Sequence, residues 1–119
     1  AASDVYKRQT LIISSCAYLD DPLKERISRA TNLLFDGTVF ENNEMEEQGL
    51  GKKTGSRMGH LPISGTNGPL EQLAPYQLNR KIFFHINNSN PIWDHSSEAF
   101  ATIQKAGWET SYDSMVLPL

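Results

Sequence analysis

The stretch KIFFHINNSNPI, residues 81–92, decides how this chain folds. Its first half, KIFFHI, is rich in apolar residues of the kind that form a buried strand, which we expect over residues 81–86. Because side chains alternate along a strand, Phe83 and His85 are expected on one face and Ile82 on the other. His85 is therefore expected to be the last inward-pointing side chain before the chain turns.

His85 is a candidate metal ligand or proton carrier because of this position. In open α/β sheets, ligands bind outside the carboxyl ends of the strands. The alternative is a structural histidine that only shapes the turn. Asn88 and Asn90 fit a turn before Pro91, since asparagine side chains hydrogen-bond their own backbone in turns.

The remaining segments alternate between strand and helix, which predicts an α/β fold. A short β-branched or apolar run marks each strand except the last, which alternates like a half-exposed strand, and a capping residue or a proline marks each helix start. Besides residues 81–86, the expected strands are residues 10–13, 32–35 and 108–112. The expected helices begin at Asp21-Pro22, at Pro69 (with Leu70, Leu73 and Ala74), and at Ser96 or Ser97, and Gly107 closes the last one. The acidic residues 41–48 are expected to form a short exposed helix.

Two more candidate residues are His60, in a glycine-rich loop, and Asp36, at the end of a strand. Six glycines fall between residues 49 and 68, and long loops in compact domains are usually functional or mobile. His60 stands near the end of this loop, where it would donate a proton or a hydrogen bond, or lie on the surface as an ordinary histidine. Asp36 ends the strand at residues 32–35, as a site carboxylate or a loop cap. His95 is expected to be exposed and structural.

Composition excludes several classes of protein. The chain has 119 residues, enough for one domain, and 39% hydrophobic and 21% charged residues are typical of a globular chain. A net charge of −3 argues against nucleic-acid binding. No apolar run approaches the ~18 residues of a membrane span. The single cysteine, Cys16, excludes an internal disulfide and fits a reducing, cytoplasmic location; it is expected to be a small buried thiol or to line the rim of the site.

The sequence contains none of the compact catalytic or metal-binding motifs. There is no H-x-H, H-E-x-x-H, C-x-x-C, G-x-S-x-G or phosphate-binding loop. A metal ion needs three or more protein ligands, and this chain offers one good candidate, His85, and two or three at most. Taken alone, the sequence therefore looks like half of a metal site.

Four stretches, in this order and spacing, resemble the C-terminal part of the pyrroloquinoline quinone (PQQ) biosynthesis protein B family. They are LLFDGTVFENNEM (33–45), KKTGSRMGHLPISG (52–65), KIFFHINNSNPI (81–92) and SEAFATIQKAGWETSYDSM (97–115). The resemblance implies an α/β fold that is the C-terminal part of a metallo-β-lactamase-like αββα sandwich, truncated at the N-terminus. Residues 10–119 would be that portion of one domain. Residues 1–9, AASDVYKRQ, lack the apolar core of a signal peptide and are expected to be a non-native leader.

The resemblance also implies roles for single residues. His85 matches the family's C-terminal histidine metal ligand. His60 looks like a hydrogen-bonding or proton-transfer group. Asp36 would orient a metal ligand by hydrogen-bonding to it, without contacting the metal itself. Asn87 or Asn88 would position the substrate's polar groups.

Two departures from the metallo-β-lactamase pattern bear on the metal. The signature H-x-H-x-D-H turn is absent from this chain. SSCA, residues 14–17, follows the first strand where many members of the fold carry an aspartate that bridges two metals. One metal is therefore expected rather than two.

The implied function is PQQ biosynthesis, by hydroxylation of the tyrosine-derived ring of a glutamate–tyrosine precursor with Fe(II), or alternatively zinc, and O2 as cosubstrate. One alternative is a carrier that moves PQQ or its precursor to the periplasm, and a weaker one is a metal-dependent hydrolase. The partners would be that small molecule and the missing N-terminal half of the domain; a homodimer is left open. Without that half, a sheet edge and an apolar face would be uncovered, and the chain alone would be inactive.

Overall fold

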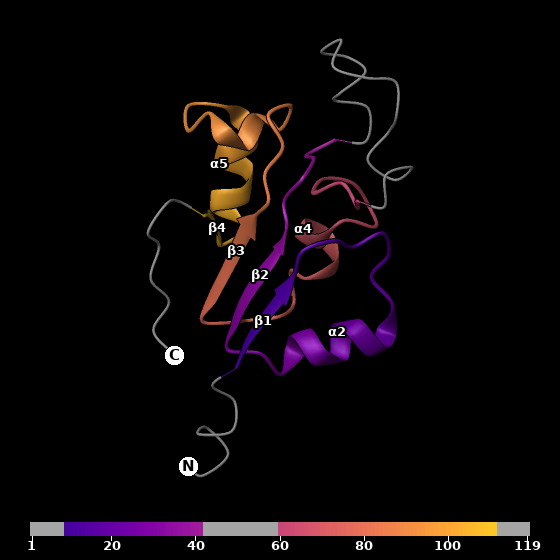
Figure 1. Ribbon diagram of the computed structural model, residues 1–119. Coiled ribbons are helices and arrows are strands. Elements are labelled where there is room, and N and C mark those ends of the chain that lie inside the picture. Colours follow the sequence, from indigo (N-terminus) through magenta and orange to yellow (C-terminus); the bar gives the residue numbers. More distant parts are fainter. Residues whose placement is uncertain (1–8, 42–59, 112–119) are drawn as a thin grey trace.

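The computed structural model describes residues 9–41 and 60–111 of the chain (Figure 1). Four parallel strands form one sheet in the order β1-β2-β3-β4, which confirms the predicted α/β class. The strands are β1 (Thr10–Ile13), β2 (Asn32–Asp36), β3 (Arg80–Phe84) and β4 (Trp108–Thr110). The helices are α2 (Asp21–Ser28), α4 (Pro69–Gln72), the 3-10 turn η2 (Pro91–Trp93) and α5 (Glu98–Lys105).

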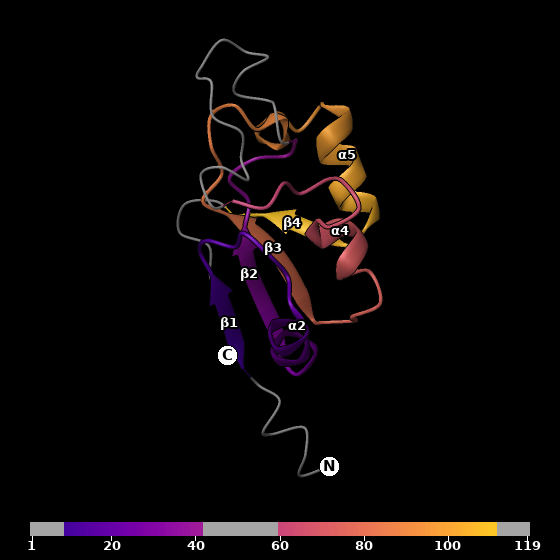
Figure 2. The same ribbon diagram turned by 90° about the vertical axis from the view of Figure 1, so that its right-hand side faces the viewer.

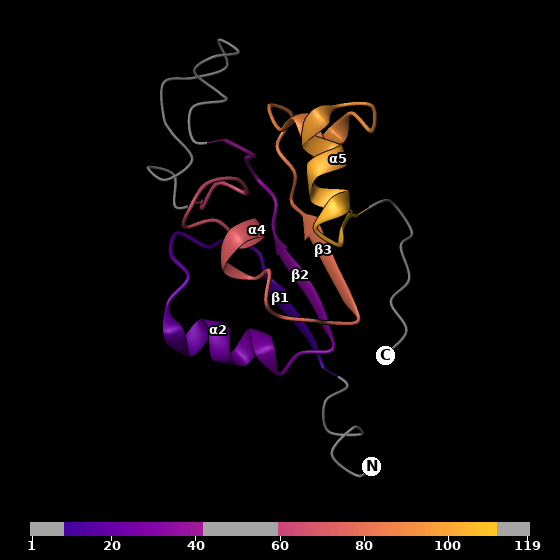
Figure 3. The ribbon, with the colours of Figure 1, turned by 180° about the vertical axis from the view of Figure 1, so that it is seen from behind.

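The helices lie on one face of the sheet. Strands that follow one another in the chain are neighbours in the sheet, and right-handed crossovers between such parallel strands place every connecting helix on the same side. Figure 2 shows α2, α4 and α5 on one side of the strands, and Figure 3 shows this helical side from the front. The carboxyl ends of all four strands therefore meet at one edge of the sheet.

Between the sheet and these helices lies an aromatic core. Phe35 of β2 and Phe83 of β3 are fully buried. The Phe83 ring stacks on Trp108 with 3.9 Å between ring centroids, and Phe35 meets Trp108 edge-on at 6.3 Å. Ile27 of α2 and Ile103 of α5 pack into the same cluster. Since buried aromatic rings contribute large apolar areas, this cluster fixes the helices on the sheet.

The opposite face of the sheet carries a row of side chains in register. Ile12, Leu34, Ile82 and Glu109 are aligned across the four strands. None of the described helices covers this face, where Ile12 is 60% exposed and Leu34 is half-buried. Glu109 accepts two hydrogen bonds from Arg80, from Nε at 2.8 Å and from Nη2 at 2.7 Å.

Most helix starts agree with the sequence prediction, with one shift. The cap of α2 is Asp20, whose Oδ1 accepts the Leu23 N–H at 2.9 Å, so the predicted cap Asp21 was one residue late. Asp20 serves because its backbone is still extended while Asp21 is already helical. Ser97 caps α5 by accepting the Phe100 N–H at 3.1 Å, and Gly107 leaves that helix with a φ of 86°.

Several predicted segments differ or lie outside the described residues. The helix α4 is a single turn that ends at Gln72, so Leu73 is its buried cap and Ala74 lies beyond it, exposed. Of the predicted acidic helix only Glu41 is described, and residues 1–8 of the predicted leader and Tyr112 also lie outside the described residues. Among the described residues there is no helix with the length and hydrophobicity to cross a bilayer.

The strand β3 ends earlier than predicted, and this corrects the orientation of His85. The prediction ran to Ile86, whereas β3 stops at Phe84. His85 has a φ of 59°, in the left-handed region, and its side chain is exposed. The Phe84 carbonyl still accepts the Gly37 N–H at 2.8 Å, but the chain turns immediately afterwards. The alternation therefore stops before His85, and the expectation that it points inward was wrong.

Gly37 is required at the end of β2. A Cβ atom there would lie 2.9 Å from both Phe83 Cβ and the Phe84 carbonyl oxygen. Because backbone of the neighbouring strand cannot yield cheaply, we expect Gly37→Ala to lower the free energy of unfolding by about 1–3 kcal/mol. Urea denaturation of the two proteins measures this, and equal midpoints would show that the two strands separate without cost.

The Arg80–Glu109 pair makes stability depend on pH. The hydrogen bonds from Arg80 lower the pKa of Glu109, although burial opposes them. With its folded-state pKa below the unfolded one, Glu109 stabilises the fold above the ordinary glutamate pKa of about 4.3, and this contribution is lost as the pH falls through the folded pKa.

We expect Glu109→Gln to lower the free energy of unfolding at pH 7 by up to about 1 kcal/mol, since the pair is partly exposed. The difference from the unmodified chain should shrink at pH 3. Urea denaturation at pH 7, 5 and 3 checks this, with Glu25→Gln as the control because Glu25 pairs with Arg29 only at 3.8 Å and both side chains are exposed. A difference that stays constant to pH 3 would contradict the assignment.

Candidate functional site

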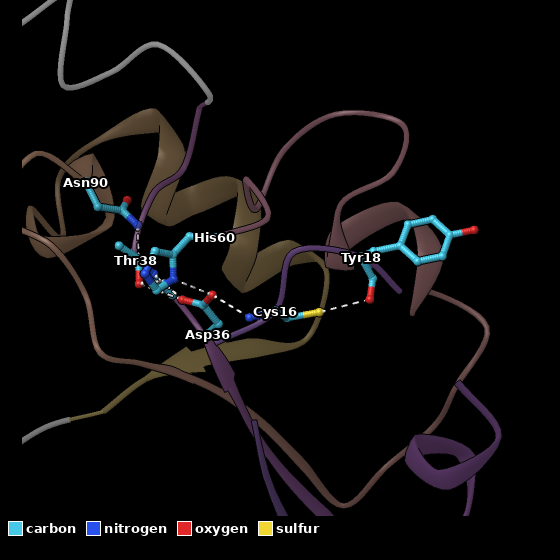
Figure 4. Close-up of polar contacts among 7 residues, drawn as sticks. Cys16, Tyr18, Asp36, Thr38, His60 and Asn90 are labelled. Atoms are coloured by element: carbon cyan, nitrogen blue, oxygen red, sulfur yellow. Dashed lines mark hydrogen bonds and ion pairs between the residues drawn. The ribbon is translucent and has the colours of Figure 1, made fainter. Parts of the chain in front are cut away.

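The carboxylate of Asp36 is the centre of a hydrogen-bonded cluster at the carboxyl edge of the sheet (Figure 4). Asp36 is the last residue of β2 and is fully buried. Its Oδ2 accepts the Cys16 N–H at 3.0 Å and contacts His60 Nδ1 at 2.8 Å. Its Oδ1 accepts both the Thr38 N–H at 3.0 Å and the Thr38 hydroxyl at 2.6 Å. Four contacts satisfy this buried carboxylate, as burial of a charged group requires.

His60 meets this cluster through one nitrogen. Its Nδ1 lies 2.8 Å from Asp36 Oδ2 and 3.1 Å from Thr38 Oγ1, and the side chain is 22% exposed. A carboxylate oxygen only accepts, so Nδ1 carries the proton and donates it. The lone pair is then on Nε2, which is free to accept a proton or to bind a metal.

Asp36 and His60 are both candidate site residues of the sequence analysis, and the structure brings them into direct contact across 24 positions of sequence. A carboxylate that orients a histidine in this way is common behind metal ligands and in acid–base pairs. The arrangement therefore supports either use of Nε2.

Cys16 holds the cluster together with its backbone rather than its side chain. Its N–H donates to Asp36, and its carbonyl accepts the N–H of Leu61, the neighbour of His60. Its thiol donates to the Tyr18 carbonyl at 3.4 Å and points away from the Asp36–His60 pair (Figure 4). Cys16 is therefore the small buried thiol of the sequence prediction, and it does not line the Asp36–His60 contact.

The thiol of Cys16 has low reactivity. Burial, the largest effect, raises its pKa; the hydrogen bond to Tyr18 lowers it, and the charges of Asp36 and Asp20 raise it further. The protonated form therefore prevails at neutral pH, and a thiol is a weaker nucleophile and metal ligand than a thiolate.

Backbone hydrogen bonds fasten the loop after β3 to the loop after β2. The Gly37 N–H donates to the Phe84 carbonyl at 2.8 Å, and the Asn87 N–H donates to the Thr38 carbonyl at 3.0 Å. The buried Asn90 side chain donates to the Gly37 carbonyl at 2.8 Å. The loop that carries His85 is thus held against the loop that carries the cluster.

The other predicted site residues lie on this fastened loop. His85 is exposed, with its ring 5.5 Å from that of Phe84. Asn87 is half-buried and donates to the Ser89 hydroxyl at 2.8 Å, while Asn88 is exposed. Within residues 9–41 and 60–111, no group of three or more His, Cys, Asp or Glu side chains is arranged to hold a metal. The roles of His85, Asn87 and Asn88 stay predictions.

Three contributors to the site were not anticipated. Thr38 is two residues beyond Asp36, a spacing at which a carboxylate caps a turn, and that signal was available in the sequence. Asn90 was interpreted only as a turn former before Pro91. The backbone of Cys16 has no signal in the sequence, because every residue type except proline has the same N–H and carbonyl.

Comparison with known proteins gives a consistent result, although no family model matches the chain. It is 41% identical over 112 residues to coenzyme PQQ synthesis protein B of Methylobacterium nodulans, which covers 94% of this chain and 38% of the relative. It is 45% identical over 107 residues to the protein of the same name from Ruegeria pomeroyi, covering 90% of this chain and 36% of the relative.

A solved structure agrees with this result. The 1.98 Å crystal structure of Zn²⁺-bound PqqB from Methylobacterium extorquens matches with a TM-score of 0.90 and 40% identity, over 94% of this chain and 40% of that one. The chain thus spans between a third and two fifths of the length of these relatives. The family resemblance and the fold class predicted from the four motifs are confirmed, and the chain belongs to the family of coenzyme PQQ synthesis protein B.

Proposed function

We propose that this chain contributes one part of a metal site used in PQQ biosynthesis, for hydroxylation of the tyrosine-derived ring of a glutamate–tyrosine precursor. The observation that carries the proposal is the contact of the buried Asp36 carboxylate with His60, next to the loop that carries His85 and hydrogen-bonded to it through the backbone. The relatives' shared name and the zinc in the solved relative support a metal in this pathway. The complete family protein, of which this chain matches less than half, would carry the activity.

The donor groups fit an iron or zinc site in part. Imidazole nitrogens suit both metals, so these residues do not distinguish Fe(II) from zinc. His85 would hold the metal through its exposed ring, and Nε2 of His60 would remain free for proton transfer. Asp36 is not available as a ligand, because its oxygens already have four contacts. The remaining ligands would come from outside residues 9–41 and 60–111.

The residues of this chain would then have separate roles in proton transfer and substrate binding. Iron, when bound, would supply dioxygen activation. His60 would move a proton at Nε2, and Asp36 would stabilise the imidazolium form by accepting from Nδ1. Asn88, which is exposed on the loop that carries His85, and Asn87 would hydrogen-bond the precursor's polar groups. We expect a cytoplasmic location, because the single cysteine fits a reducing compartment and the proposed reaction belongs to cofactor biosynthesis. These roles do not require a dimer.

The overall test is metal content and oxygen uptake in a full-length relative purified without oxygen. Iron near one per chain with uptake that depends on the tyrosine-containing precursor is the expected result. Binding of PQQ without metal and without uptake would favour the carrier instead. Precursor hydrolysis with zinc would favour a hydrolase.

His85 is tested by its effect on metal content. In a full-length relative, we expect substitution of the position matching His85 by alanine to abolish tight metal binding, because loss of one of about three or four ligands removes the site. Metal analysis after dialysis measures this. The control is alanine at the position of His95, an exposed histidine whose ring stacks on Phe100 at 4.2 Å. An unchanged metal content in the His85 variant would show that His85 is not a metal ligand.

His60 is tested by separating metal content from turnover. We expect His60→Ala, at the matching position of the same relative, to keep the metal and to lower turnover by roughly 10²–10⁴-fold, as loss of an acid–base group does. Loss of metal would instead make His60 a ligand. Normal turnover with normal metal content would remove His60 from the mechanism.

A further inference from the structure

The hydroxyl of Thr38 contacts both members of the Asp36–His60 pair (Figure 4). It is 2.6 Å from Asp36 Oδ1 and 3.1 Å from His60 Nδ1. We propose that Thr38 is a positioning residue, which together with Asp36 holds His60 in one tautomer and one ring orientation so that Nε2 is the reactive nitrogen. This rests on the proposed use of His60 in proton transfer.

Counting protons assigns each contact. Thr38 has one hydroxyl proton, and Asp36 Oδ1, which has no proton of its own to give, is the closer neighbour at 2.6 Å. The proton therefore goes to Asp36, and a lone pair of Thr38 Oγ1 faces His60 Nδ1. Nδ1 then faces two acceptors, at 2.8 Å and 3.1 Å, so its proton is shared between them. A lone pair on Nδ1 would be repelled by both oxygens.

The Thr38 hydroxyl restricts the orientation of the His60 ring, which the Asp36 carboxylate alone does not. A single contact with Asp36 selects the tautomer but lets the imidazole pivot about it. Two oxygens from different side chains restrict that rotation and set the direction of Nε2. The hydroxyl also fixes the carboxylate plane by binding the oxygen that does not contact His60.

Thr38 connects this pair to the loop that carries His85. While its hydroxyl binds Asp36 and His60, its carbonyl accepts the Asn87 N–H at 3.0 Å. One residue therefore holds both His60 and the loop beside His85. Catalytic groups lose much of their effect when displaced by about 1 Å, so this linkage bears directly on turnover.

A purely structural role for the hydroxyl makes different predictions. The Thr38 N–H already closes the turn by donating to Asp36 Oδ1 at 3.0 Å, and any residue except proline at position 38 offers that bond. If the hydroxyl only stabilised this turn, its removal would lower stability without changing the protonated nitrogen of His60.

The experiment compares Thr38→Val, which keeps the shape and removes the hydroxyl, with Thr38→Ser, which keeps the hydroxyl. Both are made at the matching position of a full-length relative that carries the same Asp, Thr and His. The imidazole ¹⁵N shifts of histidine-labelled protein report the tautomer. The control is valine at the position of Thr102, whose hydroxyl only donates to the Glu98 carbonyl on α5.

We expect the unmodified protein, Thr38→Ser and the control to show Nδ1 protonated at His60. Thr38→Val should shift both nitrogens toward a mixture of tautomers and lower kcat by about 10–100-fold with little change in KM, as loss of a supporting hydrogen bond typically does. Urea denaturation confirms that each variant is folded.

Unchanged ¹⁵N shifts in Thr38→Val would overturn the positioning role, whatever its stability. Failure of Thr38→Ser to restore the tautomer would do the same. If the shifts change as expected but neither this variant nor His60→Ala affects oxygen uptake, the positioning role stands and the proposed function fails. The two outcomes are therefore separate.

Discussion

The structure of the site depends on the burial of one carboxylate. Asp36 has no exposed surface, and a buried charge without partners is strongly unfavourable. Its partners come from three separate segments: the loop after β1, the loop after β2, and the segment at His60 that follows residues 42–59. Each segment has to be in place for the carboxylate to be satisfied. The need to pair Asp36 thus couples the arrangement of these loops to the fold.

The sheet provides the platform on which this is achieved. Parallel strands in sequence order bring all carboxyl ends to one edge, so the loops after β1, β2 and β3 are neighbours by topology. The stack of Phe83 on Trp108 holds β3 and β4 together below that edge, and Gly37 lets the loop after β2 approach β3 closely. Rigid elements therefore position loops that carry polar groups, which is the usual division of roles in α/β proteins.

Local sequence patterns predicted the strands and helices well, because these elements depend mainly on residues that are close together in the sequence. Apolar runs identified the strands, and Asp or Ser before a helix identified its start to within one residue. His85 shows where such patterns fail. Alternation was extended past Phe84, but the backbone at His85 is left-handed, and the hydrogen bonds that turn the chain there come from Gly37 and Thr38, about fifty positions earlier in the sequence.

The site itself was foreseen as a set of residues but not as a geometry. The motifs grouped Asp36, His60 and His85, yet nothing in the spacing indicated that Asp36 and His60 touch, or that Thr38 and the Cys16 backbone complete the cluster. Contacts across 20 or 24 positions follow from the sheet order and the loop paths, which local patterns do not encode.

The geometry also constrains how the two histidines can cooperate. His60 is fixed through its Nδ1 by side chains, whereas within residues 9–41 and 60–111 no side chain hydrogen-bonds the exposed ring of His85. A group that transfers protons gains from a fixed direction, because the proton has to travel along one line. An exposed imidazole can instead be oriented by the metal it binds. The unequal restraint of the two rings thus agrees with unequal roles, in which the proton is moved by the ring that the protein itself holds in place.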